Sequence, residues 1–154
     1  MYSNLKNINA LHIYISECKN YKSLTDSTRK LHVSATQSAK NTDSLGDSKN
    51  SVDWQGEAWY RVMDDAGTRI PEDPFTSVQT DLYRYCKTGC PGYLPRGSHP
   101  QNPGELVDNV KVCYNCNGNK CNYSNHAVKI RHCGAYFVYY LTKAHSTPMR
   151  YCTE

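Results

Sequence analysis

Four residues in the last third of the chain have types and spacing that could bind a metal ion. Cys113 and Cys116 have the C-x-x-C spacing. Cys121 follows after four intervening residues, and His126 follows after four more. Thiolate and imidazole ligands suit tetrahedral Zn²⁺, so these residues form the candidate site of an intracellular zinc-binding module. A zinc knuckle has its histidine third and its last cysteine fourth, however, and this interpretation leaves the remaining cysteines without a role.

The same thiols could instead serve catalysis. A redox C-x-x-C motif belongs at a strand-to-helix junction, which the sequence around Cys113 does not indicate. A cysteine nucleophile needs a free thiolate beside a base, and no local arrangement marks any histidine as that base. We expect each of them to be a surface or strand residue: His99, His126, His132 and His145. Because a G-x-S-x-G elbow is also absent, the sequence predicts no catalytic residues and no enzyme.

The number and setting of the cysteines favour a third use, which is disulfide bonding. The chain of 154 residues holds eight cysteines, and all but Cys18 lie between Cys86 and Cys152, among Gly, Pro, Asn and Tyr. An even number in such a setting is typical of a disulfide framework, and disulfides persist mainly in secreted and cell-surface proteins. With 13 tyrosines but only two phenylalanines, the apolar core is modest and needs covalent staples. We therefore expect an extracellular protein without a cofactor or a metal site.

Charge and hydropathy argue against other partners. The formal net charge is +4, but the 18 basic residues are dispersed and form no run of the kind that binds nucleic acid. No apolar stretch approaches the ~20 residues that a membrane-spanning helix needs. Residues 1–17 are an uncertain segment without a clear leader after Met1. We expect that the natural start lies upstream, or that the chain is a fragment with neighbouring extracellular domains.

The elements that must position these residues are predicted to be strands and loops, because helical periodicity is weak throughout. Residues 34–51 are rich in Ser, Asn and Lys and are interpreted as a polar N-terminal insertion, either a long solvated loop or a disordered insert. The Gly- and Pro-rich residues 89–103 are also predicted to be a loop. Alternating or β-favouring residues predict strands at 58–63, 82–85, 106–113, 128–132 and 136–141.

The last two of these strands flank Cys133-Gly134, which predicts a β-hairpin. Tyr139 and Tyr140 must face opposite sides of the final strand, so one should enter the core and the other could contact a partner. Asn122, in the sequon Asn-Tyr-Ser, is the expected glycan acceptor of a secreted protein. Together these features predict a small all-β, disulfide-rich antiparallel sheet domain with long loops.

The order of several short motifs resembles one family of extracellular modules. Trp59–Val62 (WYRV) precedes Gly67–Pro71 (GTRIP). Further matches are Gly97–Pro100 (GSHP), Gly104–Val107 (GELV), Val128–Cys133 (VKIRHC), Tyr136–Leu141 and Arg150–Cys152. This series resembles the uromodulin-type eight-cysteine domain, the cysteine-rich module of uromodulin and the zymogen-granule membrane glycoprotein. The resemblance implies a domain over residues 18–153, of which 54–153 are the well-matched core.

The resemblance also implies how most cysteines pair. The implied bridges are Cys18–Cys133, Cys86–Cys152 and Cys113–Cys121. Two other bridges of the family are missing here together with both of their partners. One would join the region of Ser51–Asp53 to Thr147, and the other would join the region of Asp73 to Lys120.

Cys90 and Cys116 remain outside the family's pattern, and we infer that they bond to each other. The function that the resemblance implies is a secreted or cell-surface recognition or adhesion module. Such a module is stapled by disulfides and binds a protein or glycan partner without catalysis. The sequence names neither the ligand nor the residues that bind it.

Overall fold

The computed structural model describes residues 15–31, 45–48, 51–74, 82–116, 119–145 and 148–154. The predictions made for residues 1–14, for most of the 34–51 loop, and for the side chains of Asn122 and His126 lie outside this description. The described residues form strands and short 3-10 helices, which confirms the predicted all-β class. In chain order the elements are η1 (Ser16–Cys18), β1 (Lys22–Leu24), η2 (Ser27–Arg29), β2 (Ala58–Val62), η4 (Asp64–Ala66), η5 (Leu82–Lys87), β3 (Cys90–Tyr93), β4 (Leu106–Cys116), β5 (Asn119–His132), β6 (Phe137–Leu141) and β7 (Met149–Tyr151).

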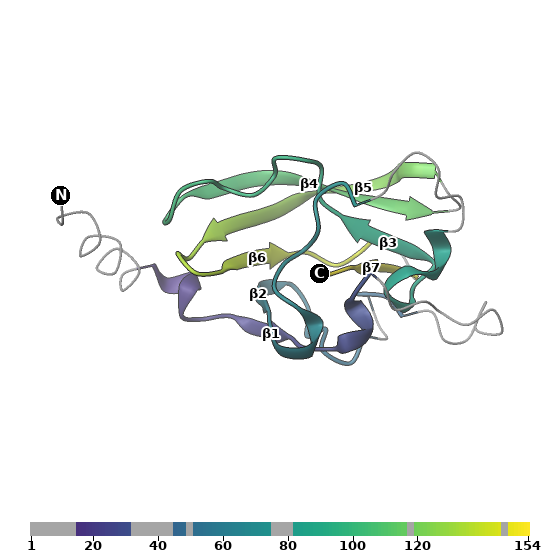
Figure 1. Ribbon diagram of the computed structural model, residues 1–154, viewed down its shortest axis with the longest axis horizontal. Helices are drawn as coiled ribbons and strands as arrows, with labels where there is room; N and C mark the ends of the chain where they lie inside the picture. The colour runs from purple at the N-terminus through teal and green to yellow at the C-terminus, as the bar shows by residue number, and fades with distance from the viewer. Residues whose placement is uncertain (1–14, 32–44, 49–50, 75–81, 117–118, 146–147) are drawn as a thin grey trace.

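The described strands form one curled sheet of seven, in the order β1-β2-β6-β5-β4-β3-β7 (Figure 1). Its centre is antiparallel, from β2 through β6, β5 and β4 to β3. The two outer pairs, β1 with β2 and β3 with β7, are parallel. The predicted antiparallel sheet is thus confirmed for the centre, and each edge adds one parallel pair. Two parallel strands are linked by a long connection rather than a tight turn. Hairpin signals in the sequence therefore do not reveal such pairs.

The two edges of the sheet are tied together beyond the ends of β1 and β7. Lys30 and Thr153 form a parallel bridge, and the Thr153 N–H donates to the Arg29 carbonyl at 2.9 Å. Along β7, the Asp47 N–H donates to the Met149 carbonyl at 2.9 Å. These contacts satisfy backbone groups that an open edge would offer to another chain.

Tyrosines supply much of the main core, which lies on one face of the sheet. A smaller buried cluster of Cys18, Cys133 and Val138 lies on the other face, and Trp59 packs against it. Side chains alternate along the strands, so Tyr60 and Tyr139 are fully buried on the main-core face together with Ile130. Trp54 stacks on Tyr60 with ring centroids 5.3 Å apart. Tyr140 is half-buried and faces the other side. Of the two adjacent tyrosines, Tyr139 is thus the core residue.

Two local predictions are wrong. Leu82–Tyr85 is not a strand but the start of η5, because Cys86 adopts a left-handed backbone conformation (φ 42°) and bonds to Cys152. Residues 89–103 are not all loop, because Cys90–Tyr93 forms β3. A Cβ at Gly92 would lie 2.8 Å from both the Arg150 carbonyl oxygen and the Tyr114 ring. Glycine here therefore marks a close approach of neighbouring strands rather than a turn.

The polar insertion also differs from its prediction. Asp47 within the 34–51 segment is fully buried, and Ser51 is 5% exposed, so these residues are not a solvated loop. Their polar side chains meet buried arginines, as shown below. β4 and β5 also run longer than predicted. The Cys113–Cys121 disulfide and cross-strand backbone bonds sustain their polar ends without apolar alternation.

Candidate functional site

The structure joins all eight cysteines in four disulfides. The pairs are Cys18–Cys133, Cys86–Cys152, Cys90–Cys116 and Cys113–Cys121. They are the same four pairs as those expected from the sequence and the resemblance. No free thiolate therefore remains in this structure at Cys113, Cys116 or Cys121. The zinc interpretation loses its sulfur ligands, and the nucleophile interpretation loses its thiolate.

A buried cluster of charges lies where the resemblance placed one missing bridge. Arg150 is fully buried, and its Nε donates to Ser51 Oγ at 3.1 Å. Its Nη2 pairs with Asp26 Oδ2 at 2.6 Å. Ser51 belongs to the segment in which the resemblance implies a cysteine, whereas Thr147 lies outside the described residues. Polar contacts thus hold residues 45–48 and 51–53 against β7.

The Arg29 cluster (Arg29, Asp47 and Asp53) is the centre of this region. Arg29 Nη2 lies 2.7 Å from Asp47 Oδ1, and Arg29 Nε lies 2.9 Å from Asp53 Oδ2. Burial opposes the charge of Arg29, but the two carboxylates outweigh burial and raise the pKa of the guanidinium. Burial raises the pKa of Asp53, whereas its hydrogen bonds with Arg29 lower that pKa. The net pKa of Asp53 is lowered. A buried charge is stable only when it is paired and hydrogen-bonded in this way.

His99 is buried, and the prediction of a surface or strand residue is wrong. Only 7% of the residue is exposed. Its Nδ1 lies 2.7 Å from Glu72 Oε1, and its Nε2 lies 2.8 Å from the Tyr139 hydroxyl. In the neutral ring, Nδ1–H donates to Glu72 and the Tyr139 hydroxyl donates to Nε2, so both nitrogens are satisfied. Burial lowers the pKa of His99, and Glu72 offsets this effect only in part.

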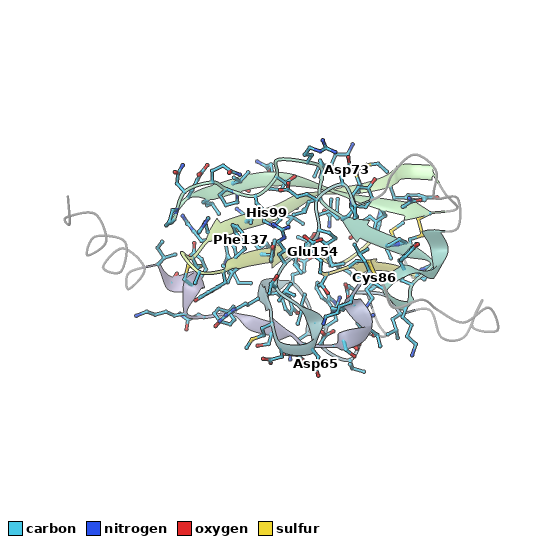
Figure 2. The ribbon with its side chains drawn as sticks, in the orientation of Figure 1. Asp65, Asp73, Cys86, His99, Phe137 and Glu154 are labelled. Carbon is cyan, nitrogen blue, oxygen red and sulfur yellow. A yellow bond between two sulfur atoms is a disulfide. The ribbon has the colours of Figure 1, made fainter. Side chains whose placement is uncertain are left out.

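His99 and Glu72 fasten the loop at residues 94–99 to the sheet. Figure 2 shows His99 beside Phe137, and the ring centroids are 4.6 Å apart. Glu72 also accepts the backbone N–H of Gly97 at 2.8 Å and that of His99 at 2.7 Å. Because both nitrogens of His99 are already bonded inside the protein, the ring offers no general base to a substrate in this arrangement.

The face of the sheet opposite the main core, called the outer face here, presents half-buried aromatic side chains. Trp59 on β2 and Tyr140 on β6 are cross-strand neighbours, with T-shaped rings whose centroids are 5.7 Å apart. Tyr140 lies opposite Lys129 on β5. The exposed Lys129 Nζ pairs with Asp108 Oδ2 at 3.0 Å. A row of two rings and one ion pair therefore crosses the sheet on its outer face.

Arg61 lies two residues after Trp59 on β2 and so shares the outer face. Its guanidinium carbon is 3.8 Å from the centroid of the Tyr136 ring and 5.8 Å from that of Tyr21. Arg61 Nη1 donates to the Tyr21 hydroxyl at 3.0 Å. The Tyr136 hydroxyl donates to the Cys18 carbonyl at 2.6 Å. The Cys18–Cys133 disulfide thus holds the tyrosine that supports Arg61.

Comparison with known proteins decides the family. Residues 60–153, more than half of the chain, match the family described as the uromodulin-like domain. The chain belongs to this family. The resemblance seen in the sequence motifs is confirmed, and the four disulfides described above are the cysteine framework of this member.

Known relatives of this uromodulin-like domain are much longer than the chain. The pancreatic secretory granule membrane major glycoprotein GP2 of Rattus norvegicus is 34% identical over 146 residues, covering 92% of this chain and 24% of the relative. The same-named protein of Mus musculus is 33% identical over 149 residues, with the same two coverages. The chain thus spans about a quarter of the length of these relatives.

The family, its glycoprotein relatives and the four disulfides show an extracellular, disulfide-rich domain. No helix among the described residues combines the length and the apolar character needed to cross a membrane. Asn122 lies on β5, and its role as a glycan acceptor stays a prediction because its side chain is not described.

Two features of the structure were missed by sequence reasoning. The first is the buried contact of His99 with Glu72, residues that are 27 positions apart. The second is Arg61 on the outer face, although a signal for it existed. In the WYRV strand, alternation places Trp59 and Arg61 on one face and Tyr60 and Val62 on the other.

Proposed function

We propose that this uromodulin-like domain is a non-catalytic recognition module that binds an extracellular protein or glycan through the outer face of its sheet. The observation that carries the proposal is the pair of half-buried rings, Trp59 and Tyr140, on the face that the main core does not use. Aromatic side chains with partly exposed faces supply contact area at a small loss of conformational entropy. The neighbouring Lys129–Asp108 pair provides a polar rim.

The surroundings of the domain support a role in binding. Its relatives are named as major glycoproteins of a secretory granule membrane, so a domain of this family is part of membrane glycoproteins. In this chain, the histidine most suited to catalysis, His99, is bonded on both sides within the fold. Disulfides occupy all eight cysteine sulfurs. These contacts favour a module that binds rather than one that catalyses.

The test compares aromatic variants on two parts of the surface. Labelled domain is applied to a glycan array and to cells that display extracellular proteins, and retained signal is measured. Trp59→Ala and Tyr140→Ala should each lower binding at least tenfold. Tyr123→Ala, which removes a tyrosine that is 48% exposed on β5, is the matched control and should bind as the natural chain does. Equal loss in all three variants, or in none, would count against the outer face.

The glycan on Asn122 is a separate proposal that rests on the sequon alone. Expression in a secretory host should add a glycan mass that enzymatic deglycosylation removes. Asn122→Gln should lack that mass. An unchanged intact mass for the natural chain after deglycosylation would reject the proposal.

A further inference from the structure

Among the arginines whose side chains the structure describes, Arg61 differs from the others because it has no carboxylate partner. Five others pair with a carboxylate: Arg29, Arg69, Arg96, Arg131 and Arg150. Even Arg96, whose side chain is 83% exposed, lies 3.5 Å from Asp73. Arg61 makes no ion pair within the described part of the chain, and its Nε has no hydrogen-bond acceptor although the atom is buried.

The surroundings of Arg61 leave its charge electrostatically incomplete. Partial burial removes water from the guanidinium, and an N–H that loses water without gaining an acceptor carries the full desolvation penalty. The rings of Tyr136 and Tyr21 return only a cation–π attraction. Buried polar groups without partners are rare enough in folded proteins that each one calls for an explanation. An anion from outside the chain would supply the missing counter-charge.

We propose that Arg61 binds the acidic group of a saccharide, a carboxylate or a sulfate, while the sugar ring packs against Trp59 and Tyr140. The inference rests on the proposed function, because it names the class of partner for the same outer face. A guanidinium presents its donors as a planar fork that matches the oxygens of such anions. Lys129 and Asp108, on the far side of Tyr140, provide a donor and an acceptor for sugar hydroxyls.

The position of Arg61 favours a saccharide over an acidic peptide. Extended peptides commonly bind by adding a strand to the open edge of a sheet. Arg61 is on β2, which lies between β1 and β6 and has no free edge along its paired residues. A ligand at Arg61 therefore meets side chains on the flat face of the sheet. That face offers two rings and one unpaired cation, which suits a compact ring bearing a negative charge.

The experiment measures affinities of the full chain for matched pairs of probes by calorimetry. The acidic probes are 3′-sialyllactose, lactose 3′-sulfate and a glucuronate-containing tetrasaccharide, and each is compared with its uncharged counterpart. Inorganic sulfate and a short Glu-rich peptide are included. We expect at least one acidic saccharide to bind at least tenfold more tightly than its neutral counterpart, with a preference that shrinks as salt is added.

Variants connect this preference to Arg61. Arg61→Met should bring the affinity for the acidic probe down to that for the neutral one, and Arg61→Lys should retain only part of the preference. Arg96→Met removes the same charge from an exposed site and should leave the preference unchanged. Thermal unfolding of each variant, measured beside the natural chain, distinguishes a lost site from a lost fold.

Three results would overturn the inference. They are equal affinity for acidic and neutral saccharides, an acidic preference that survives Arg61→Met in a folded protein, and binding of sulfate or the Glu-rich peptide alone. If neutral saccharides or a protein bind through Trp59 and Tyr140 without any acidic preference, this inference fails and the proposed function stands. If neither Trp59→Ala nor Tyr140→Ala changes any binding, the proposed function fails as well.

Discussion

Arg29 and Arg61 lie in two regions that differ in what surrounds the guanidinium group. Arg29 is fully buried and donates to two carboxylates, those of Asp47 and Asp53. Arg61 is half-buried on the outer face and is flanked by tyrosine rings, and no carboxylate among the described residues pairs with it. Asp47 and Asp53 contact Arg29, whereas the strand β2 that carries Arg61 contains no acidic residue.

The fold uses the charge of Arg29, but not that of Arg61, to hold its own segments together. The Arg29 cluster joins η2, residues 45–48, residues 51–53 and the end of β7, since Arg29 Nη1 also donates to the Tyr151 carbonyl at 3.0 Å. It lies where the resemblance implies a bridge that this chain lacks, and it holds these segments together by charge. Arg61 joins little beyond Tyr21 and Tyr136. Its charge is therefore available to a partner, and the following predictions test that distinction.

The largest effect should come from the disulfide under the Arg61 region. Replacing Cys18 and Cys133 together by Ala opens a link between residues separated by 115 positions. The chain-entropy account predicts a loss of about 4–5 kcal/mol in unfolding free energy for a loop of this length. Urea unfolding monitored by tryptophan fluorescence measures it. Because Tyr136 loses its support, the same variant should also lose the acidic preference, and a preference retained at full strength would contradict this link.

A slightly smaller loss should follow from Arg29→Met. The variant leaves Asp47 and Asp53 buried without their cation, and breaking a buried pair in this way costs about 3–5 kcal/mol. The midpoint of urea unfolding should fall accordingly. Adding Asp47→Asn and Asp53→Asn to the same chain should restore part of the stability, because no uncompensated charge remains. If the triple variant were no more stable than Arg29→Met, the loss would have another cause than charge.

The next largest effect should come from acid, which weakens the hydrogen bond between His99 and Tyr139. The pKa of His99 is lowered by burial, so the folded state favours the neutral ring. Its contribution is complete above the ordinary pKa of about 6.5 and is lost as the pH falls below that value. In the protonated ring Nε2 carries a hydrogen, so it can no longer accept from the Tyr139 hydroxyl. The charged groups near the ring are Glu72, Arg69 and Glu154.

We expect this to lower the unfolding free energy by about 1–2 kcal/mol, the scale of one unsatisfied buried group. Thermal midpoints between about pH 8 and pH 5.5 measure the slope. His99→Gln should be less stable at the higher pH and show a flatter profile. Asp53 should not contribute in this range, because its pKa is already below its ordinary acidic value. An identical slope in both proteins would show that another group titrates.

The smallest change in stability should come from Arg61→Met, although its effect on ligand binding should be the largest. Losing a cation–π contact at a partly exposed site costs about 0.5–1 kcal/mol, and removing a half-desolvated charge offsets part of that loss. Urea unfolding should therefore hardly distinguish this variant from the natural chain. A loss comparable to that of Arg29→Met would mean that Arg61 is structural.

Much of the framework could be predicted because it depends on local patterns. Aromatic and β-branched residues identified β2 and β6, and alternation identified part of β5. Strand geometry also required Tyr139 and Tyr140 to face opposite sides. Gly and Pro misled the prediction at β3, where Gly92 is required by the packing of Tyr114 and the Arg150 backbone rather than by a turn.

The candidate site was harder to predict because its contacts join distant parts of the chain. Arg61 meets Tyr21 and Tyr136 only after β1, β2 and β6 have assembled. Polar residues near position 47 suggested a solvated loop, since composition does not reveal that a buried arginine needs their carboxylates. That Arg61 lacks a carboxylate partner emerges only when every other described arginine has been matched with its own.

The most direct test of this contrast follows the side-chain N–H signals of the arginines and tryptophans by NMR as 3′-sialyllactose is added, with lactose as the control. We expect the Nε–H of Arg61 and the indole N–H of Trp59 to shift with the acidic sugar, while the Nε–H of Arg29, bonded to Asp53, stays in place. Lactose should not move the Arg61 signal. Signals of Arg61 and Trp59 that remain unchanged at millimolar acidic saccharide, or that shift equally with lactose, would contradict the account.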